Sequence, residues 1–131
     1  MLSSIISKGF TSQAAVIHKG KLGEEKAQQF LKQQGYKILA VNYQLRCGEI
    51  DIIAQKGKVI IFAEVKTRIS DLYGVPAAAV NLKKQQKIIK VARQYLLRHN
   101  KEDGPCRFDV IEVYLRDNNS KINHIEDAFW A

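Results

Sequence analysis

The sequence predicts an α/β fold in which two helices pack on a mixed sheet. Apolar residues recur at helical spacing over residues 21–34 and 81–99, and five other segments carry the apolar patterns of strands. The order is helix, three strands, helix and two strands. Strands joined by tight turns are antiparallel, whereas the second helix is long enough to cross over to a parallel strand. The helices are therefore expected to cover a sheet of mixed strand direction.

The two predicted helices are supported by their apolar stripes and by a stop signal. Ala27, Phe30 and Leu31 recur at helical spacing in the first helix, and Gly35 is a typical residue just after a last turn. The second helix carries five apolar side chains on one side, which we expect to be buried. These are Ile88, Ile89, Ala92, Tyr95 and Leu96.

Strands are expected at residues 36–45, 49–55, 58–67, 107–115 and 121–125. Lys56-Gly57 is a tight-turn signal between the second and third of them. If these two residues are the whole loop, Asp51 pairs with Phe62 and Glu49 with Glu64. Asp51 and Glu64 then lie diagonally on one face, with Cα atoms roughly 7–8 Å apart.

Side-chain alternation assigns these strand residues to faces. Glu49, Asp51 and Ile53 are expected on one face, and Ile50 and Ile52 on the other. A slip of one residue in the hairpin would put the carboxylates of the two strands on opposite faces. The apolar pattern favours the register in which they share a face.

Length and composition indicate one domain with a real core. Of the 131 residues, 46% are hydrophobic. We expect a flexible extension over residues 1–19 and the folded domain over residues 20–131. The longest apolar run, residues 59–63, is far shorter than the roughly 20 residues of a membrane-spanning helix. No signal peptide is evident, and two cysteines without metal-site spacing are expected to be small buried side chains in a cytoplasmic protein.

The net charge of +8 favours a phosphate-bearing partner, because clustered lysines and arginines release counterions from a polyanion. Several basic residues lie along one side of the second helix or in neighbouring loops. We expect Arg46, Arg68, Lys83, Lys84 and Lys87 to contact nucleic acid. The alternative is that the lysines form an ordinary solvated helix face.

Three acids and a lysine are expected on one face of the hairpin: Glu49, Asp51, Glu64 and Lys66. Like charges at this range repel each other, and a divalent cation removes the repulsion. Two carboxylates and a backbone carbonyl form the oxygen site that Mg²⁺ accepts, with water completing its shell. Lys66 beside such a site could hold a phosphate or orient a water. The alternative, a surface ion pair, is opposed by Ile60 and Phe62 on the same face.

Glu24 is a fourth candidate acid, on the core-facing side of the first helix. It is a plausible outer ligand of the same cation. An acid near a helix start also complements the helix dipole, which is the alternative explanation.

Taken together, the motifs resemble the PD-(D/E)XK nuclease superfamily and, more narrowly, the bacterial YraN family, over about residues 20–129. The matching residues are Gly23-Glu24, Gly35-Tyr36, Asn42, Gly48-Glu49-Ile50-Asp51, Glu64-Val65-Lys66-Thr67-Arg68, Tyr73-Gly74, Val80, Lys84, Arg107-Phe108-Asp109-Val110 and Asp127-Ala128-Phe129. Ile50 replaces the proline of the superfamily motif. Archaeal-type Holliday junction resolvases arrange a helix Glu, a strand Asp and a Glu-x-Lys similarly.

The resemblance implies a restriction-endonuclease-like core and a metal-dependent nuclease site. Asp51 and Glu64 would hold Mg²⁺ or Mn²⁺ with the Val65 carbonyl, and Lys66 would position or help to deprotonate the attacking water. Glu24 would bind the metal through water. Gln85 would occupy the place where relatives carry a helix Gln or Lys.

The expected activity is hydrolysis of phosphodiesters in DNA rather than RNA, with branched or structured DNA as a candidate substrate. Related resolvases pair to act on two strands, so a homodimer is expected. A nucleic-acid-binding module with little or no catalysis is the alternative function. An adaptor that docks an acidic protein is a third.

Other polar residues are expected to have structural roles. Arg107 and Asp109 share a strand face and are read first as an ion pair, with a phosphate contact as the alternative. The histidines, His18, His99 and His124, are isolated in the sequence. Tyr43 and Tyr73 could stack on bases, but core packing is favoured.

Overall fold

The computed structural model describes residues 20–68, 80–116 and 119–131. Its centre is one sheet with the strand order β1-β2-β3-β4-β5. The strands are β1 (Lys37–Leu45), β2 (Gly48–Lys56), β3 (Val59–Arg68), β4 (Cys106–Leu115) and β5 (Ser120–Phe129). Residues 20–33 form a helix, here called the N-terminal helix, and α2 spans Leu82–Arg98. The predicted α/β class and element order are confirmed.

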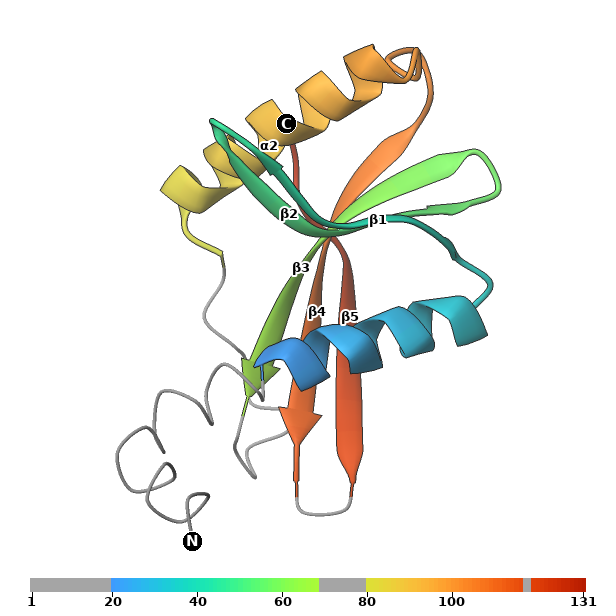
Figure 1. Cartoon of the computed structure of the whole chain (residues 1–131), viewed down its shortest axis with the longest axis vertical. Coiled ribbons are helices and arrows are strands. Elements are labelled where there is room, and N and C mark those ends of the chain that lie inside the picture. Colours follow the sequence, from blue (N-terminus) through green and yellow to red (C-terminus); the bar gives the residue numbers. More distant parts are fainter. Residues whose placement is uncertain (1–19, 69–79, 117–118) are drawn as a thin grey trace, which may run out of the picture.

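The strand directions also follow the prediction. β3 and β4 are parallel and are joined through α2, whereas the other neighbouring strands are antiparallel. Figure 1 shows the two helices on either side of the twisted sheet. This arrangement is consistent with a restriction-endonuclease-like fold.

Each helix covers its own face of the sheet and its own part of the core. Ala27 and Leu31 of the N-terminal helix pack with Ile61 and Ala63 of β3. Alternate residues of the same strand, including Phe62, pack with the buried stripe of α2. That stripe comprises Ile88, Val91, Ala92, Tyr95 and Leu96. The prediction that Ile89 belongs to it is wrong, because Ile89 is only partly buried. Because both faces are covered, the central strands are apolar along their length rather than alternating.

The end of the N-terminal helix follows its sequence signal, and the start of α2 is capped by a side chain. Gly35 has a φ of +92°, and the backbone N–H of Tyr36 donates to the carbonyl of Leu31 at 2.9 Å. This is the left-handed glycine stop that the sequence predicts. At the start of α2, the Asn81 side chain accepts a hydrogen bond from the backbone N–H of Lys84 at 2.9 Å.

The predicted register of the β2–β3 hairpin is wrong by two residues. Lys56 pairs with Val59 and Gln55 with Ile60, so the loop is Gly57-Lys58 rather than Lys56-Gly57. Gly57 has a φ of +60°, and the first central position of such a turn is the one that requires a positive φ. A shift of two residues keeps every side chain on its face. Continuing this register places Asp51 level with Glu64, not with Phe62.

β2 bends at the same place. Its pairing with β3 begins at Ile52, whereas its pairing with β1 continues to Gly48. Ile50 consequently packs in the same cluster as Ile53, on the α2 side. The predicted assignment of these two residues to opposite faces is therefore wrong, because strict alternation fails where the strand leaves its neighbour.

Three smaller features complete the fold. β5 runs to Phe129, beyond the predicted end at residue 125, and Phe129 stacks on Phe108 with ring centroids 5.1 Å apart. Cys47 is half-buried, but Cys106 is exposed at the start of β4, contrary to expectation. Over the described residues, no helix has the length and apolar character needed to cross a membrane.

Candidate metal and nucleic-acid site

Asp51 and Glu64 are two buried carboxylates at the point where β2 diverges from β3. Their exposed fractions are 9% and 6%. The backbone N–H of Val65 donates to Oδ2 of Asp51 at 2.8 Å. The Asp51 side chain therefore takes the hydrogen bond that a continuing β2 backbone would take, which draws its carboxylate to β3 beside Glu64.

The charge of this pair is not fully neutralised. Burial and the neighbouring charge of Glu64 raise the pKa of Asp51 to about 7, and the charge of Glu24 adds to this effect. The hydrogen bond from Val65 and the charge of Lys84 act in the opposite direction but are weaker. A cation near Asp51 would therefore favour the ionised form of this carboxylate, which otherwise tends to keep its proton.

Lys84 is the cation that the structure brings to the pair. Its Nζ lies 2.6 Å from Oε1 of Glu64, and this hydrogen bond is the main reason that the pKa of Lys84 is raised. The sequence predicts only a nucleic-acid contact for Lys84. The missed signal is helical spacing, because Lys84 lies four residues before the buried Ile88 and therefore on the same side of α2.

Glu24 reaches this region because the start of the N-terminal helix lies directly against β3. A Cβ atom on Gly23 would lie 1.9 Å from Oγ1 of Thr67, so only glycine allows this approach. Glu24 is half-buried, and Oε2 of its side chain lies 3.4 Å from Nδ2 of Asn42. Its charge contributes to the raised pKa of Asp51, as expected of an acid near the pair.

The other predicted residues lie around the pair in different roles. Lys66 is half-buried and lies two residues after Glu64 along β3, on the same strand face. Glu49 is exposed and accepts a hydrogen bond from Gln44 at 2.8 Å. The Gln85 side-chain amide donates to the carbonyl of Val80 at 2.7 Å, so this nitrogen holds the start of α2.

The ligand set is small. Among the residues that the structure describes, no three Asp, Glu, His or Cys side chains come together as a metal site. Asp51 and Glu64 supply two carboxylates, and Val65 adds a backbone carbonyl. This donor set fits Mg²⁺, which keeps several waters and needs few protein ligands.

Arg68 is anchored rather than free on the surface. Its Nε lies 3.2 Å from Oε2 of the fully buried Glu112, whose Oε1 accepts a hydrogen bond from Asn123 at 2.8 Å. Arg46 is exposed in the turn between β1 and β2. The predicted core packing of Tyr43 is confirmed by its edge-on contact with Tyr95, and Tyr73 lies outside the described residues.

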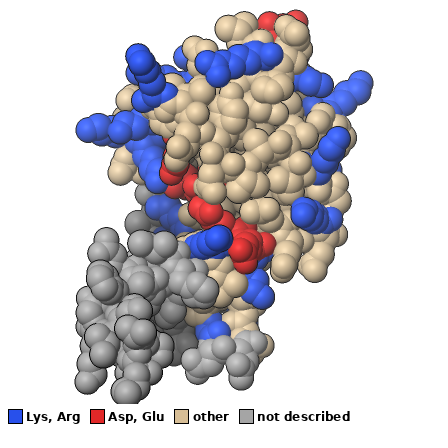
Figure 2. Space-filling model, viewed as in Figure 1, with Lys and Arg blue, Asp and Glu red and all other residues tan. Residues whose placement is uncertain are grey.

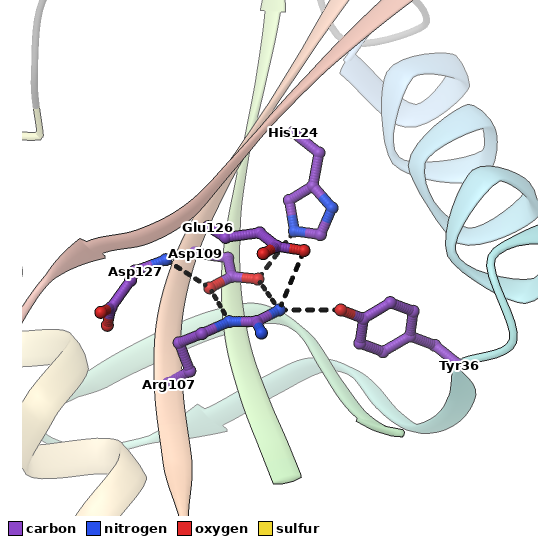
Figure 3. A network of polar contacts seen from close by, with 6 residues as sticks. All are labelled: Tyr36, Arg107, Asp109, His124, Glu126 and Asp127. Carbon is purple, nitrogen blue, oxygen red and sulfur yellow. Dashed lines mark hydrogen bonds and ion pairs between the residues drawn. The ribbon is translucent and has the colours of Figure 1, made fainter. Parts of the chain in front are cut away.

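A second polar network lies on the opposite face of the sheet (Figure 3). Arg107 donates to both oxygens of Asp109 at 2.8 Å, which confirms the predicted ion pair, and also to the Tyr36 hydroxyl at 2.7 Å. His124 Nε2 lies 2.7 Å from Asp109, so His124 is not isolated in the fold. The backbone N–H of Asp127 donates to Asp109 at 3.0 Å.

Figure 2 shows how charged side chains are distributed over one face of the molecule. On this face most Asp and Glu side chains form one band between the two helices, with Lys and Arg beside it. A cavity of about 440 Å³ lies between the start of β2 and the first turns of α2. Lys83, Lys84 and Lys87 line it, so these three predicted nucleic-acid residues share one site.

The comparisons with known proteins identify relatives. A family model described as "Uncharacterised protein family UPF0102" matches residues 23–113. A UPF0102 protein of Alkaliphilus oremlandii is 53% identical over 84% of this chain and 96% of its own length. Another, of Clostridioides difficile, is 50% identical over 85% of this chain and 96% of its own length.

One solved structure shows a distant likeness. Pyrococcus furiosus SfsA, solved in complex with Ca²⁺, aligns with a TM-score of 0.39 at 14% identity. The alignment covers 85% of this chain and 63% of that chain.

Proposed function

The chain belongs to the UPF0102 family, which confirms the predicted resemblance to YraN proteins, and from its site we propose that it is a divalent-metal-dependent endonuclease acting on DNA. One observation carries the proposal. Asp51 and Glu64 are buried side by side, and burial together with the charge of Glu64 raises the pKa of Asp51. Such a pair is costly for stability and is typical of sites that bind a cation.

The roles of the residues follow from their positions. Asp51, Glu64 and the carbonyl of Val65 would hold Mg²⁺ or Mn²⁺, and Glu24 would contact it through water. The bound cation would neutralise charge developing on a phosphodiester and lower the pKa of an attacking water. Lys66, on the same strand face as Glu64, would hold a phosphate oxygen or orient that water. Lys84 would move from Glu64 to a substrate phosphate.

The test is cleavage by purified protein of a panel of single-stranded, duplex and branched DNA, with an RNA strand included, in Mg²⁺ or Mn²⁺. We expect wild-type protein to cleave at least one DNA substrate and Asp51→Asn to lose about 100-fold or more, as losing a group that acts on transition-state charge costs about 10²–10³. Asp103→Asn makes the same chemical change at an exposed turn and should cleave normally. Equal cleavage by both variants would reject the site.

A binding module without catalysis is the second candidate. The observation that favours it is the ion pair of Lys84 with Glu64 at 2.6 Å, which already supplies part of the missing positive charge. Calorimetric titration with MnCl₂ separates the two functions. Heat of binding that disappears in Asp51→Asn supports the nuclease, whereas DNA binding without metal uptake supports the module.

A further inference from the structure

The cavity beside Asp51 and Glu64, here called the acid pair, has a cationic rim. Seven residues line it: Gly48, Glu49, Asn81, Lys83, Lys84, Lys87 and Ile88. Three are lysines and one is an acid. Glu49 is exposed and hydrogen-bonded to Gln44, so the local charge favours an anionic ligand.

The inner wall of the cavity is apolar. Gly48 has no side chain and packs so closely on α2 that a Cβ there would lie 3.3 Å from Cβ of Lys87. The wall is therefore formed by backbone, the aliphatic stem of Lys87 and the buried Ile88. Lysine stems cover apolar surface while their ammonium groups reach water. An apolar wall below ammonium groups matches a nucleotide, with a planar base and an anionic phosphate.

The size of the cavity limits what can enter. A volume of about 440 Å³ lies at the lower end of small-ligand sites, which span about 300–1,000 Å³. A DNA duplex cannot enter it, since the major groove alone is about 12 Å wide. One nucleotide is the unit of DNA that fits.

Lys84 connects this cavity to the acid pair. It lines the cavity, and its Nζ also lies 2.6 Å from Oε1 of Glu64. A nucleotide held in the cavity would therefore neighbour a phosphate at Asp51 and Glu64 along the same strand.

We propose that this cavity binds one unpaired nucleotide next to the phosphate that is cleaved, so that the protein selects DNA containing an unpaired nucleotide over continuous duplex. Cleavage of that phosphate rests on the proposed function, whereas the binding preference does not. A paired nucleotide would first have to leave the base stack, which costs free energy that an unpaired one does not lose. The selection is thus made by the cavity, without any reading of base sequence.

The experiment measures binding by full-length wild-type protein in EDTA, where no metal-dependent cleavage occurs. Fluorescence anisotropy compares a labelled duplex that contains one unpaired nucleotide with the same duplex fully paired. A third duplex carries an abasic residue at the unpaired position. We expect the unpaired nucleotide to increase affinity by about tenfold or more, and the abasic residue to remove most of that gain.

Protein variants then locate the effect. Lys83→Gln with Lys87→Gln should abolish the preference and lower the dependence of log affinity on log salt by about one per lysine. Lys90→Gln is the matched control, because it removes the same charge from an exposed position of α2 outside the cavity lining. It should keep the preference. Equal binding of paired and unpaired duplexes, or a preference that survives the double substitution, would overturn the inference.

Failure of the proposed function would look different. A protein that shows the preference in EDTA but cleaves no DNA with any metal keeps the nucleotide site and loses the nuclease activity. A protein that cleaves DNA but ignores the unpaired nucleotide keeps the nuclease and loses the nucleotide site.

Discussion

Two buried carboxylate clusters, the pair of Asp51 and Glu64 and the network around Asp109, lie on opposite faces of one sheet and are neutralised to different degrees. Burial alone would raise the pKa of Asp109, but hydrogen bonds from His124, Arg107 and the backbone of Asp127 outweigh it and lower that pKa below its ordinary value. Asp51 is also buried, receives one backbone hydrogen bond, and has a carboxylate neighbour, so its pKa is raised to about 7. The hydrogen-bond donors around each carboxylate, rather than its burial, decide which cluster stabilises the fold and which can bind a cation.

The largest expected effect is on the Asp109 cluster, in which hydrogen-bond donors neutralise the carboxylate. Asp109→Ala leaves Arg107 and His124 without their shared carboxylate in a fully buried position. Removing one partner of a buried ion pair costs about 3–5 kcal/mol, so we expect a loss of that size in the free energy of unfolding measured with urea. Glu126→Ala is the control, because Glu126 is mostly exposed and 3.7 Å from Arg107. It should cost less than about 1 kcal/mol.

For the pair of Asp51 and Glu64 we expect the opposite effect, a gain in the free energy of unfolding when one carboxylate is neutralised. An acid whose pKa is raised in the folded state makes the protein less stable as the pH rises from the ordinary pKa of the acid to the raised one. For Asp51 this range runs from 3.8 to about 7. Asp51→Asn removes this charge but keeps an oxygen for the N–H of Val65. In EDTA at pH 8 we expect the variant to be more stable than wild type by about 1 kcal/mol or more, and the gain to vanish near pH 4.

Asp103→Asn serves as the control for this measurement and should change stability by less than about 0.5 kcal/mol at either pH. A loss of stability in Asp51→Asn at pH 8 would show that Asp51 is already neutralised by the protein, and the contrast between the two clusters would fail.

The two clusters also differ in how far the sequence predicted them. Arg107 and Asp109 are two residues apart on one strand, so alternation alone predicted their ion pair. His124 joins them only because β5 pairs with β4, where His124 lies opposite Ile111. These strands are consecutive, but their register shifts between Phe108 and Val110, and local sequence patterns do not predict such an irregularity. His124 therefore looks isolated in the sequence.

At the acid pair, the choice of residues came from the sequence but their geometry did not. The turn was placed one residue early, because Lys56-Gly57 and Gly57-Lys58 look equally suitable until the positive φ of Gly57 is known. The bend of β2 and the ion pair of Lys84 with Glu64 depend on tertiary packing. The end of the N-terminal helix and both ends of α2, by contrast, were predicted to within one residue, since caps such as Asn81 and Gly35 act locally.

A smaller effect should appear at acid pH. Because the folded pKa of Asp109 is lowered, its stabilisation is fully present above its ordinary value of 3.8 and is lost as pH falls through the lowered value. We therefore expect the difference in unfolding free energy between wild type and Asp109→Asn to shrink below pH 4, by at most about 1.4 kcal/mol per pH unit. Chemical denaturation at pH 7, 4 and 3 measures it. A difference that grows toward pH 3 would contradict the sign.

The smallest expected effect is at Tyr36, which lies at the edge of the Asp109 cluster. Tyr36→Phe removes the hydroxyl that accepts from Arg107 Nη2 at 2.7 Å, while Nη2 keeps its contact with Asp109 at 2.8 Å. We expect a loss of about 0.5–1.5 kcal/mol, the usual net value of one hydrogen bond. Tyr43→Phe is the control, because the half-buried Tyr43 ring contacts Tyr95 edge-on and that contact survives loss of the hydroxyl.

If Tyr36→Phe instead costs as much as Asp109→Ala, the Tyr36 hydroxyl orients Arg107 and the cluster acts as one unit rather than as separate bonds. If it costs nothing, Asp109 alone satisfies Arg107. Either result would show how many donors and acceptors a buried carboxylate needs before it ceases to be available for a cation, which is the property that separates Asp109 from Asp51.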